Sequence, residues 1–266
     1  MDANTEITKY TIVIIQSLKE KDLKTGHMLY DNLSSSLPAK YTDTSVRFYD
    51  VKDKLELAKV FCEVYNDIDD GELLTLQIEA HGCEDGIGLS SDELVTWEEF
   101  YGLIRPINMK MVNLLLVCMS MCYGGALIKH IEPEKRAPYR AFIGTGSTVK
   151  AGVLLDGFAA FYEKYHNLLD LFAAYDALKN ATIDAATGRS PFWFMTSEEV
   201  FKKTFDPDRD PDNFKHIVNE QYVRQRLEGR NVTKEQVAIE IRDMLIESDK
   251  LYYENYTFGD IIPKHI

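Results

Sequence analysis

Two apolar, strand-like runs in the chain each end in one reactive side chain that is followed closely by glycine. The first run, residues 73–80, leads into His81, and the second, residues 112–121, leads into Cys122. Short, nearly continuous apolar runs are typical of strands that are buried on both faces of a parallel sheet. Neighbouring parallel strands end at the same edge of a sheet, where the functional groups of such folds gather. The pattern therefore predicts an imidazole and a thiol side by side.

Further strands and helices alternate around these two runs. Strands are expected over 10–16, 44–51 and 140–144, and helices over 26–37, 53–68, 97–104, 151–165 and 168–178. Asp53 is placed to cap its helix, whose apolar stripe contains Leu57, Phe61, Val64, Tyr65 and Ile68. Thr96 and Glu99 form a capping-box pattern, and Pro38 and Pro106 are expected to stop helices. The alternation predicts an α/β fold with a mostly parallel central sheet and helices on both faces.

The character of the chain changes after Gly188. A last strand over 190–195 is followed by helices over 196–205, 213–227 and 233–248, with an acidic break over 206–212. We expect a sheet-containing domain over residues 1–188 and a helical C-terminal extension over residues 189–266 that packs on it.

Composition limits the classes of function. The formal net charge is −13 and the pI about 5.0, and no cluster of basic residues is present, so direct nucleic-acid binding is not expected. The first residues lack the features of a signal peptide, and the longest apolar run is too short to cross a bilayer. Four cysteines are too few for a disulfide scaffold. We expect a soluble, reduced, cytoplasmic protein with no membrane contact.

The residues at the two strand ends fit nucleophilic catalysis by cysteine. A cysteine needs a base or a cation nearby to react well near neutral pH. His81 can take the thiol proton of Cys122 and return it to a leaving amine. The backbone N–H groups of Gly82 and Cys122 can form an oxyanion hole, because glycine leaves its N–H open to a substrate carbonyl. Cys122 is also expected to open a helix, whose N-terminal dipole would favour the thiolate.

The order of these motifs resembles the caspase-like cysteine peptidases, a group that includes caspases, metacaspases, legumains, gingipains and the bacterial CHAT proteases. The resemblance rests on one hydrophobic block that ends in His81-Gly82 and a second that ends in Cys122-Tyr123-Gly124. The segment 141–165, AFIGTGSTVKAGVLLDGFAAFYEKY, resembles the strand, loop and helix that follow in the CHAT proteins. The likeness covers residues 10–180.

The resemblance implies a caspase-like peptidase domain over 1–188, with His81 as general base and acid, Cys122 as nucleophile and Gly82 as oxyanion donor. It also implies cleavage after a preferred side chain that is held in a pocket beside the first and fifth strands. Asp156 is a candidate for lining that pocket and selecting Arg or Lys, and its alternative interpretation is a solvated acid. Many relatives have a small residue before the nucleophile, where this chain has Met121. An inactive member of the group therefore stays an alternative.

The other reactive groups have simpler interpretations. Cys118 lies mid-strand and is expected to be an inert core thiol, and Cys83 is expected to be incidental. Glu79 shares a strand face with His81 and is either an orienting group or a structural one. His81, Cys83, Cys118 and Cys122 have the donor types of a zinc site, but their spacing lacks a C-x₂-C knuckle.

We therefore expect an intracellular caspase-like cysteine endopeptidase of bacterial type that hydrolyses peptide bonds in a protein partner and needs no cofactor or metal. An uncontrolled protease is hazardous in a cell, so we expect regulation by a partner protein, by a ligand on that partner, or by self-cleavage. The alternative is a catalytically inactive caspase-like scaffold that acts as a protein-binding module.

Overall fold

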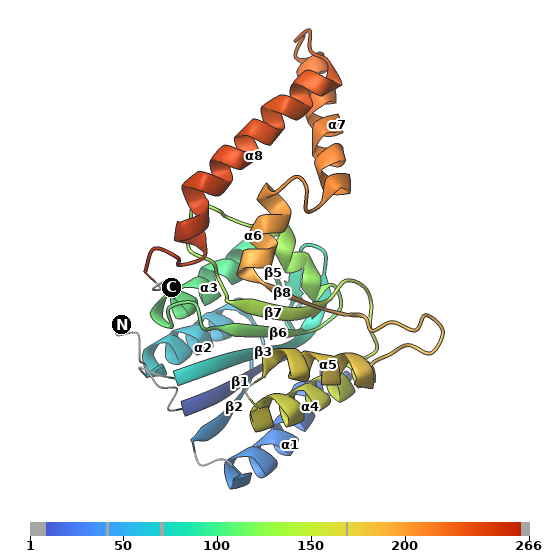
Figure 1. Ribbon diagram of the computed structural model, residues 1–266. Coiled ribbons are helices and arrows are strands. Elements are labelled where there is room, and N and C mark those ends of the chain that lie inside the picture. Colours follow the sequence, from blue (N-terminus) through green and yellow to red (C-terminus); the bar gives the residue numbers. More distant parts are fainter. Residues whose placement is uncertain (1–8, 41–42, 70–71, 169, 262–266) are drawn as a thin grey trace. The chain divides into compact units, whose positions relative to one another are not determined.

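The chain folds into two compact units. The structure, a computed structural model, describes residues 9–40, 43–69, 72–168 and 170–261 (Figure 1). One unit comprises Met1–His130 and Pro138–Thr196, and the other Ile131–Ala137 and Ser197–Ile266. The described strands all lie in the first unit. The predicted boundary between residues 188 and 189, and the packing of the extension on the sheet, stay predictions.

A single sheet organises the first unit. Its strands are β1 (Lys9–Ser17), β2 (Thr44–Asp50), β3 (Glu72–Cys83), β4 (Gly86–Gly88), β5 (Leu94–Thr96), β6 (Leu116–Ser120), β7 (Ala141–Thr145) and β8 (Phe192–Thr196). The main path runs β2-β1-β3-β6-β7-β8, parallel throughout except for the antiparallel edge strand β8. β4 and β5 form a small antiparallel hairpin beside the end of β3. The predicted α/β class with a mostly parallel sheet is confirmed.

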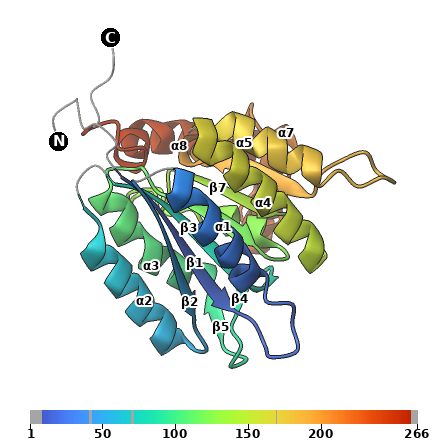
Figure 2. The same ribbon diagram turned by 90° about the horizontal axis from the view of Figure 1, so that it is seen from below.

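Helices cover both faces of this sheet (Figure 2). They are α1 (Thr25–Lys40), α2 (Lys54–Asp67), α3 (Trp97–Lys110), the 3₁₀ helix η1 (Gly124–His130), α4 (Ala151–Leu168) and α5 (Leu171–Ala181). α1, α4 and α5 pack on one face, where Leu33, Phe158 and Leu178 join Ile14 and Ile143 of the sheet in one core. α2 and α3 lie on the other face. The sheet is thereby buried, as continuous apolar strands require.

The predicted helix caps are confirmed. The Asp53 carboxylate accepts a hydrogen bond from the backbone N–H of Glu56 and starts α2. Thr96 and Glu99 exchange side-chain and backbone hydrogen bonds at the start of α3, which is the reciprocal capping box. Both helix starts were therefore readable from local sequence.

The expectation that two prolines stop their helices was wrong. Pro106 lies inside α3, and α1 continues past Pro38 to Lys40. A proline removes one backbone hydrogen bond, but buried packing further along can outweigh that loss. Ile107 and Asn108, the two residues of α3 that follow the proline, are fully buried, and Asn108 accepts a hydrogen bond from the Leu115 N–H at 3.1 Å. Tertiary contacts thus extend α3 by four residues beyond Pro106.

Two further details differ from the expectation. Tyr65 does not belong to the buried stripe of α2, since it is 41% exposed and lies under the ammonium of Lys110. Residues 112–115 are not strand: Val112 and Asn113 adopt positive φ in the turn between α3 and β6. A short connection between a helix and a parallel strand needs such a reversal, which an apolar run does not reveal.

The second unit is helical in its described part. It contains α6 (Ser197–Phe205), α7 (Pro211–Leu227) and α8 (Lys234–Tyr256), which confirm the three expected helices with somewhat different ends. Phe201, Tyr256 and Phe258 form a small core with Ala137 from the segment 131–137. A second small core joins Val218 of α7 to residues of α8.

Candidate functional site

The carboxyl ends of β3 and β6 bring the two predicted reactive residues to one edge of the sheet. The last paired residues of these neighbouring parallel strands are Glu79 and Ser120. His81 and Cys122 each come two residues after that pair, so the common register carries them to the same edge. β3 continues past the expected end at residue 80, and His81 pairs with Gly88 of the hairpin.

His81 is held by a carboxylate that sequence reasoning missed. Its Nε2 lies 2.8 Å from Asp22 Oδ2, while 61% of the imidazole side chain stays exposed. Asp22 belongs to the loop between β1 and α1, and its carboxylate also accepts the Lys19 N–H at 2.9 Å. The hydrogen bond from His81 is the main cause that lowers the pKa of Asp22. Nothing in the charged segment SLKEKDLKTG distinguishes Asp22 from its acidic neighbour.

The Cys122 thiol contacts the loop after β7. The backbone N–H of Val149 donates to Cys122 Sγ at 3.3 Å, and Sγ lies 3.6 Å from the Val149 carbonyl oxygen. The thiol is half-buried. In the described part of the chain its hydrogen bonds go to Val149 and those of the imidazole to Asp22, so His81 and Cys122 are not bonded to each other.

Gly82 lies directly against the backbone of the Cys122 turn. A Cβ at position 82 would come 2.1 Å from the Cys122 carbonyl oxygen and 2.9 Å from Met121 Cγ. No side chain fits there, which gives the glycine after His81 a steric role that the sequence did not show. Its role as an oxyanion donor stays a prediction.

The turn that carries Cys122 is strained and tied down. Tyr123 adopts a φ of 56°, which costs a residue with a Cβ about 1–2 kcal/mol. Its N–H donates to Ser147 O at 3.2 Å, and the Thr145 hydroxyl donates to Met121 O at 2.7 Å. These bonds join the turn to the loop after β7. Positive φ next to a reactive side chain is the kind of strain that clusters at functional sites.

The expected α-helix dipole behind Cys122 is absent from this turn. The residues that follow form η1, a 3₁₀ helix of 7 residues, rather than an α-helix that begins at Cys122. A Cβ on Gly124 would lie 2.7 Å from Met119 Cβ, so the chain doubles back closely over β6. The prediction of a helix opened by Cys122 was wrong, because the helix that follows is 3₁₀ and begins at Gly124.

Trp193 of β8 packs on both segments that border the Cys122 turn. A Cβ on Gly125 would lie 3.0 Å from its ring, and a Cβ on Gly146 would lie 2.4 Å from it. The indole is nevertheless 44% exposed. The two glycines therefore allow the large indole, which is open to solvent, to pack beside the Cys122 turn.

Asp156 lines a pocket of about 570 Å³ that also reaches Val149. The pocket therefore borders the residue that contacts Cys122. Its charged lining is mixed, because Lys150, Asp184 and Arg189 join Asp156. Asp184 accepts the N–H groups of Ala186 and Thr187 in its own loop, which lowers its pKa. The selection of a basic side chain by Asp156 stays a prediction.

The remaining cysteines lie in two settings. Cys118 is buried mid-strand, and burial raises the pKa of its thiol well above the usual range, so it has the character of an inert core thiol. Cys62 and Cys83 are exposed. Among the described residues, no three His, Cys, Asp or Glu side chains are arranged to hold a metal ion. The four groups of the zinc alternative are therefore not gathered into a ligand set.

Glu79 is fully buried beneath this edge of the sheet. Its carboxylate accepts the Thr25 hydroxyl at 2.6 Å and the Gln77 amide at 2.7 Å. Burial raises the pKa of Glu79 to about 7, against these hydrogen bonds, which favour the ionised form. The sequence left two interpretations of Glu79, an orienting group or a structural one. Its burial and its bond to Thr25 of another element favour the orienting interpretation.

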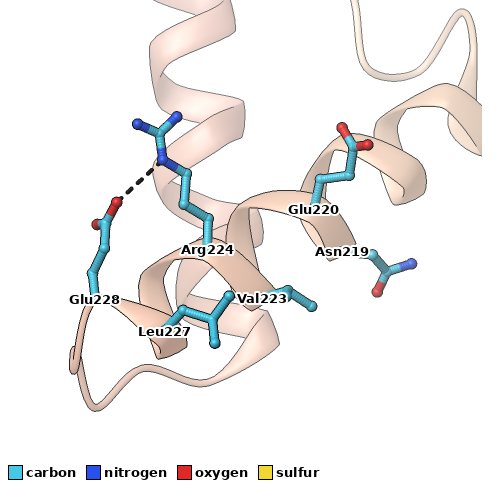
Figure 3. Close-up of a pocket in the computed structure, with 6 residues that line it drawn as sticks. All are labelled: Asn219, Glu220, Val223, Arg224, Leu227 and Glu228. Atoms are coloured by element: carbon cyan, nitrogen blue, oxygen red, sulfur yellow. Dashed lines mark hydrogen bonds and ion pairs between the residues drawn. The ribbon is translucent and has the colours of Figure 1, made fainter.

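The second unit has a separate hollow on α7 (Figure 3). It measures about 610 Å³, and six residues line it: Asn219, Glu220, Val223, Arg224, Leu227 and Glu228. Arg224 pairs with Glu228 at 3.1 Å, and Leu227 is 84% exposed. None of the predicted site residues lies there.

Comparison with known proteins supports the fold. No protein-family model matches the sequence, and no curated protein matches it. Among solved structures, the crystal structure of the Drosophila initiator caspase Dronc is similar, with a TM-score of 0.53 and 8% sequence identity. The match covers 72% of this chain and 80% of the caspase chain. The chain therefore has a caspase-like fold, and at this identity the likeness concerns the fold alone.

No helix within the described residues combines the length and the apolar character that crossing a bilayer requires.

Proposed function

We propose that the protein is a caspase-like cysteine endopeptidase in which Cys122 is the nucleophile and His81 the proton carrier. The observation that carries the proposal is the placement of both residues two positions beyond the Glu79–Ser120 pair of neighbouring parallel strands. The caspase-like fold supports it, and so does the backbone N–H that Val149 directs at the sulfur.

The proposed chemistry proceeds through an acyl-enzyme. The Cys122 thiol gives its proton to His81, and the thiolate attacks the scissile carbonyl to form the S–C bond. The C–N bond breaks as His81 returns the proton to the leaving amine. Water then attacks the thioester with His81 as base, the S–C bond breaks, and Cys122 regains its proton. No cofactor takes part in these steps.

Asp22 extends the dyad to a triad. Its carboxylate binds Nε2 of His81, so the proton exchanged with Cys122 would pass through Nδ1. A carboxylate on the far nitrogen fixes the tautomer and stabilises the imidazolium that forms. The imidazole and the thiol would come into direct contact as the substrate binds, since catalytic hydrogen bonds tighten in the Michaelis complex.

The pocket beside Val149 is the proposed site for the side chain that precedes the scissile bond. A side chain held there would lie next to the residue that contacts the sulfur. Asp156 is the lining acid that we propose to favour Arg or Lys. The nearby Lys150 and Arg189 give the competing expectation, in which an acidic side chain is preferred.

The substrate is proposed to be a protein, with a regulatory protein partner or self-cleavage controlling the enzyme. The narrower assignment to the bacterial CHAT group rests on the resemblance of residues 141–165. The exposed apolar residues Val223 and Leu227 of α7 are consistent with binding of a partner protein.

A catalytically inactive scaffold that binds a partner is the second candidate. The observation in its favour is that Cys122 Sγ bonds with Val149 while His81 bonds with Asp22. In a scaffold, the thiol would react as an ordinary cysteine and would not depend on His81.

The test is intact-mass labelling of the purified protein with peptide ketone warheads that differ only in the side chain at the cleavage position. Wild type, His81→Ala and Cys122→Ala are compared, each alone and with any co-purified partner protein. One adduct on Cys122 that depends on His81 and favours one warhead supports the peptidase. Labelling that is equal in wild type and His81→Ala, or that is absent with and without the partner, supports the scaffold.

A further inference from the structure

The buried carboxyl of Glu79 joins three elements that each carry part of the site. It belongs to β3, two residues before His81, and it lies opposite Ser120 of β6, two residues before Cys122. Its Oε2 accepts the hydroxyl of Thr25, the first residue of α1. Thr25 in turn ends the loop that carries Asp22.

The loop between β1 and α1 is held closed by hydrogen bonds between its two ends. The Lys24 ammonium donates to the carbonyl oxygens of Leu18 and Lys19, at 2.6 and 2.8 Å, and so closes the loop on itself. Asp22 reaches out from it to His81. The bond from Thr25 to Glu79 connects the closed loop to the strand of the histidine.

The start of α1 packs tightly on the same carboxyl. A Cβ on Gly26 would lie 3.0 Å from Glu79 Cγ, and the His27 N–H donates to Gln16 Oε1 of β1 at 3.2 Å. A carboxylate at the N-terminus of a helix of 16 residues is also favoured by the helix dipole. The contact is therefore both steric and polar.

The groups bonded to Glu79 are neutral. Thr25 and Gln77 donate to it, and Gln77 is itself held by the Tyr162 hydroxyl of α4 at 2.9 Å. The nearby titratable groups are Tyr162 and Cys118, and burial raises the pKa of both, so they carry no charge near neutral pH. A buried acid without a cationic partner is costly, and such groups cluster at functional sites.

We propose that Glu79 is a positioning residue: by accepting the Thr25 hydroxyl it fixes the loop that presents Asp22 to His81. The proposal rests on the proposed function, in which Asp22 orients the imidazole. Glu79 itself touches no reacting atom and acts only through Thr25, Asp22 and His81.

The test removes this hydrogen bond, the Thr25–Glu79 tether, from the Thr25 side with the substitution Thr25→Val. This change keeps the shape of the side chain and loses the hydroxyl, while α1 keeps its core anchors Leu29, Leu33 and Leu37. Thr25→Ser keeps the hydroxyl and should behave as wild type. Thr11→Val is the matched control, because it removes another buried hydroxyl, bonded to Ser45 of β2 at 2.7 Å, and Thr11 lies at the start of β1, the end of that strand opposite the loop.

The first readout is the rate of Cys122 labelling at neutral pH. Thr25→Val should slow it roughly tenfold, because the buried carboxyl loses one of its hydrogen-bond donors. In an Asp22→Ala background the same change should have almost no further effect, because both act through one path. Where wild type is labelled, an equal rate in Thr25→Val, or full additivity with Asp22→Ala, would overturn the proposal.

The second readout needs no peptidase activity. ¹⁵N NMR of the His81 ring reports whether Nε2 carries the proton that Asp22 accepts. Thr25→Val should shift this signal toward that of Asp22→Ala, while Thr25→Ser and Thr11→Val should not. If wild type resists labelling but the shift is found, the tether stands and the peptidase fails. An unchanged ring signal in Thr25→Val overturns the tether in either case.

Discussion

Asp22 Oδ2 lies 2.8 Å from His81 Nε2, although the two residues come from different elements and are far apart in the sequence. The bond links the loop after β1 to the extended end of β3. The sequence predicted only His81 and Cys122 at this edge of the sheet. The bond to Asp22 occupies Nε2 of the imidazole and leaves Nδ1 available.

Replacing Asp22 by alanine should slow His81-dependent labelling of Cys122 by roughly tenfold to a hundredfold, because the imidazole loses the group that fixes its tautomer. The check is the second-order rate constant with a peptide ketone at neutral pH. Asp92→Ala is the matched control, since Asp92 is another loop acid that forms an ion pair with Lys19 but does not contact His81. Equal effects of the two substitutions would contradict the triad.

Replacing Gly82 by alanine should both destabilise the fold and reduce labelling of Cys122. The added Cβ would meet the Cys122 carbonyl oxygen at 2.1 Å, so the turn that carries Cys122 has to move. Overpacking of this kind typically costs about 1–3 kcal/mol in the free energy of unfolding. The measurements are denaturant unfolding and the labelling rate.

Gly88→Ala is the control for that prediction. Gly88 pairs with His81 in the hairpin, but a Cβ there has ordinary contacts, 3.6 Å from His81 Cβ. It should leave labelling within about twofold of wild type. If Gly82→Ala labelled as fast as Gly88→Ala, the close contact of Gly82 with the turn would not matter for reactivity.

Glu79→Gln should change how stability depends on pH. Burial raises the pKa of Glu79 from its ordinary 4.5 to about 7, so the folded state binds this proton more tightly than the unfolded state. Its contribution to stability is then fully present below pH 4.5 and is lost as the pH rises to about 7. Between pH 4.5 and 8, wild type should lose about 3 kcal/mol of unfolding free energy relative to Glu79→Gln. Urea unfolding at several pH values measures this, and parallel curves for the two proteins would refute it.

The sequence was sufficient for the parts of the site that depend on strand order. His81 and Cys122 each follow an apolar run, and parallel neighbours place their ends together whatever the loops do. The caps at Asp53 and Thr96 were also predictable, because they involve residues only three apart.

Contacts between distant segments could not be predicted in the same way. Asp22 and Val149 come from two loops, and Trp193 comes from the edge strand β8. Tertiary packing, rather than a local sequence pattern, brings each of them to the site. Pro106 shows the same limit for the helices, since burial after it overrides a local signal to stop. Segment 131–137 joins the second unit through Ala137 and Arg136, a pairing with α8 that no periodicity reveals.

Trp193 should report on occupancy of the site by fluorescence. The chain has two tryptophans; Trp97 is fully buried, whereas Trp193 is 44% exposed and rests on Gly125 and Gly146 at the Cys122 turn. Labelling Cys122 with a bulky peptide ketone should shift the emission to shorter wavelength, because the adduct excludes water from the indole. Trp193→Phe should abolish the shift while still forming the adduct, and Cys122→Ala should show neither. A shift that persists in Trp193→Phe would mean that the adduct disturbs Trp97, and that Trp193 does not report on labelling of Cys122.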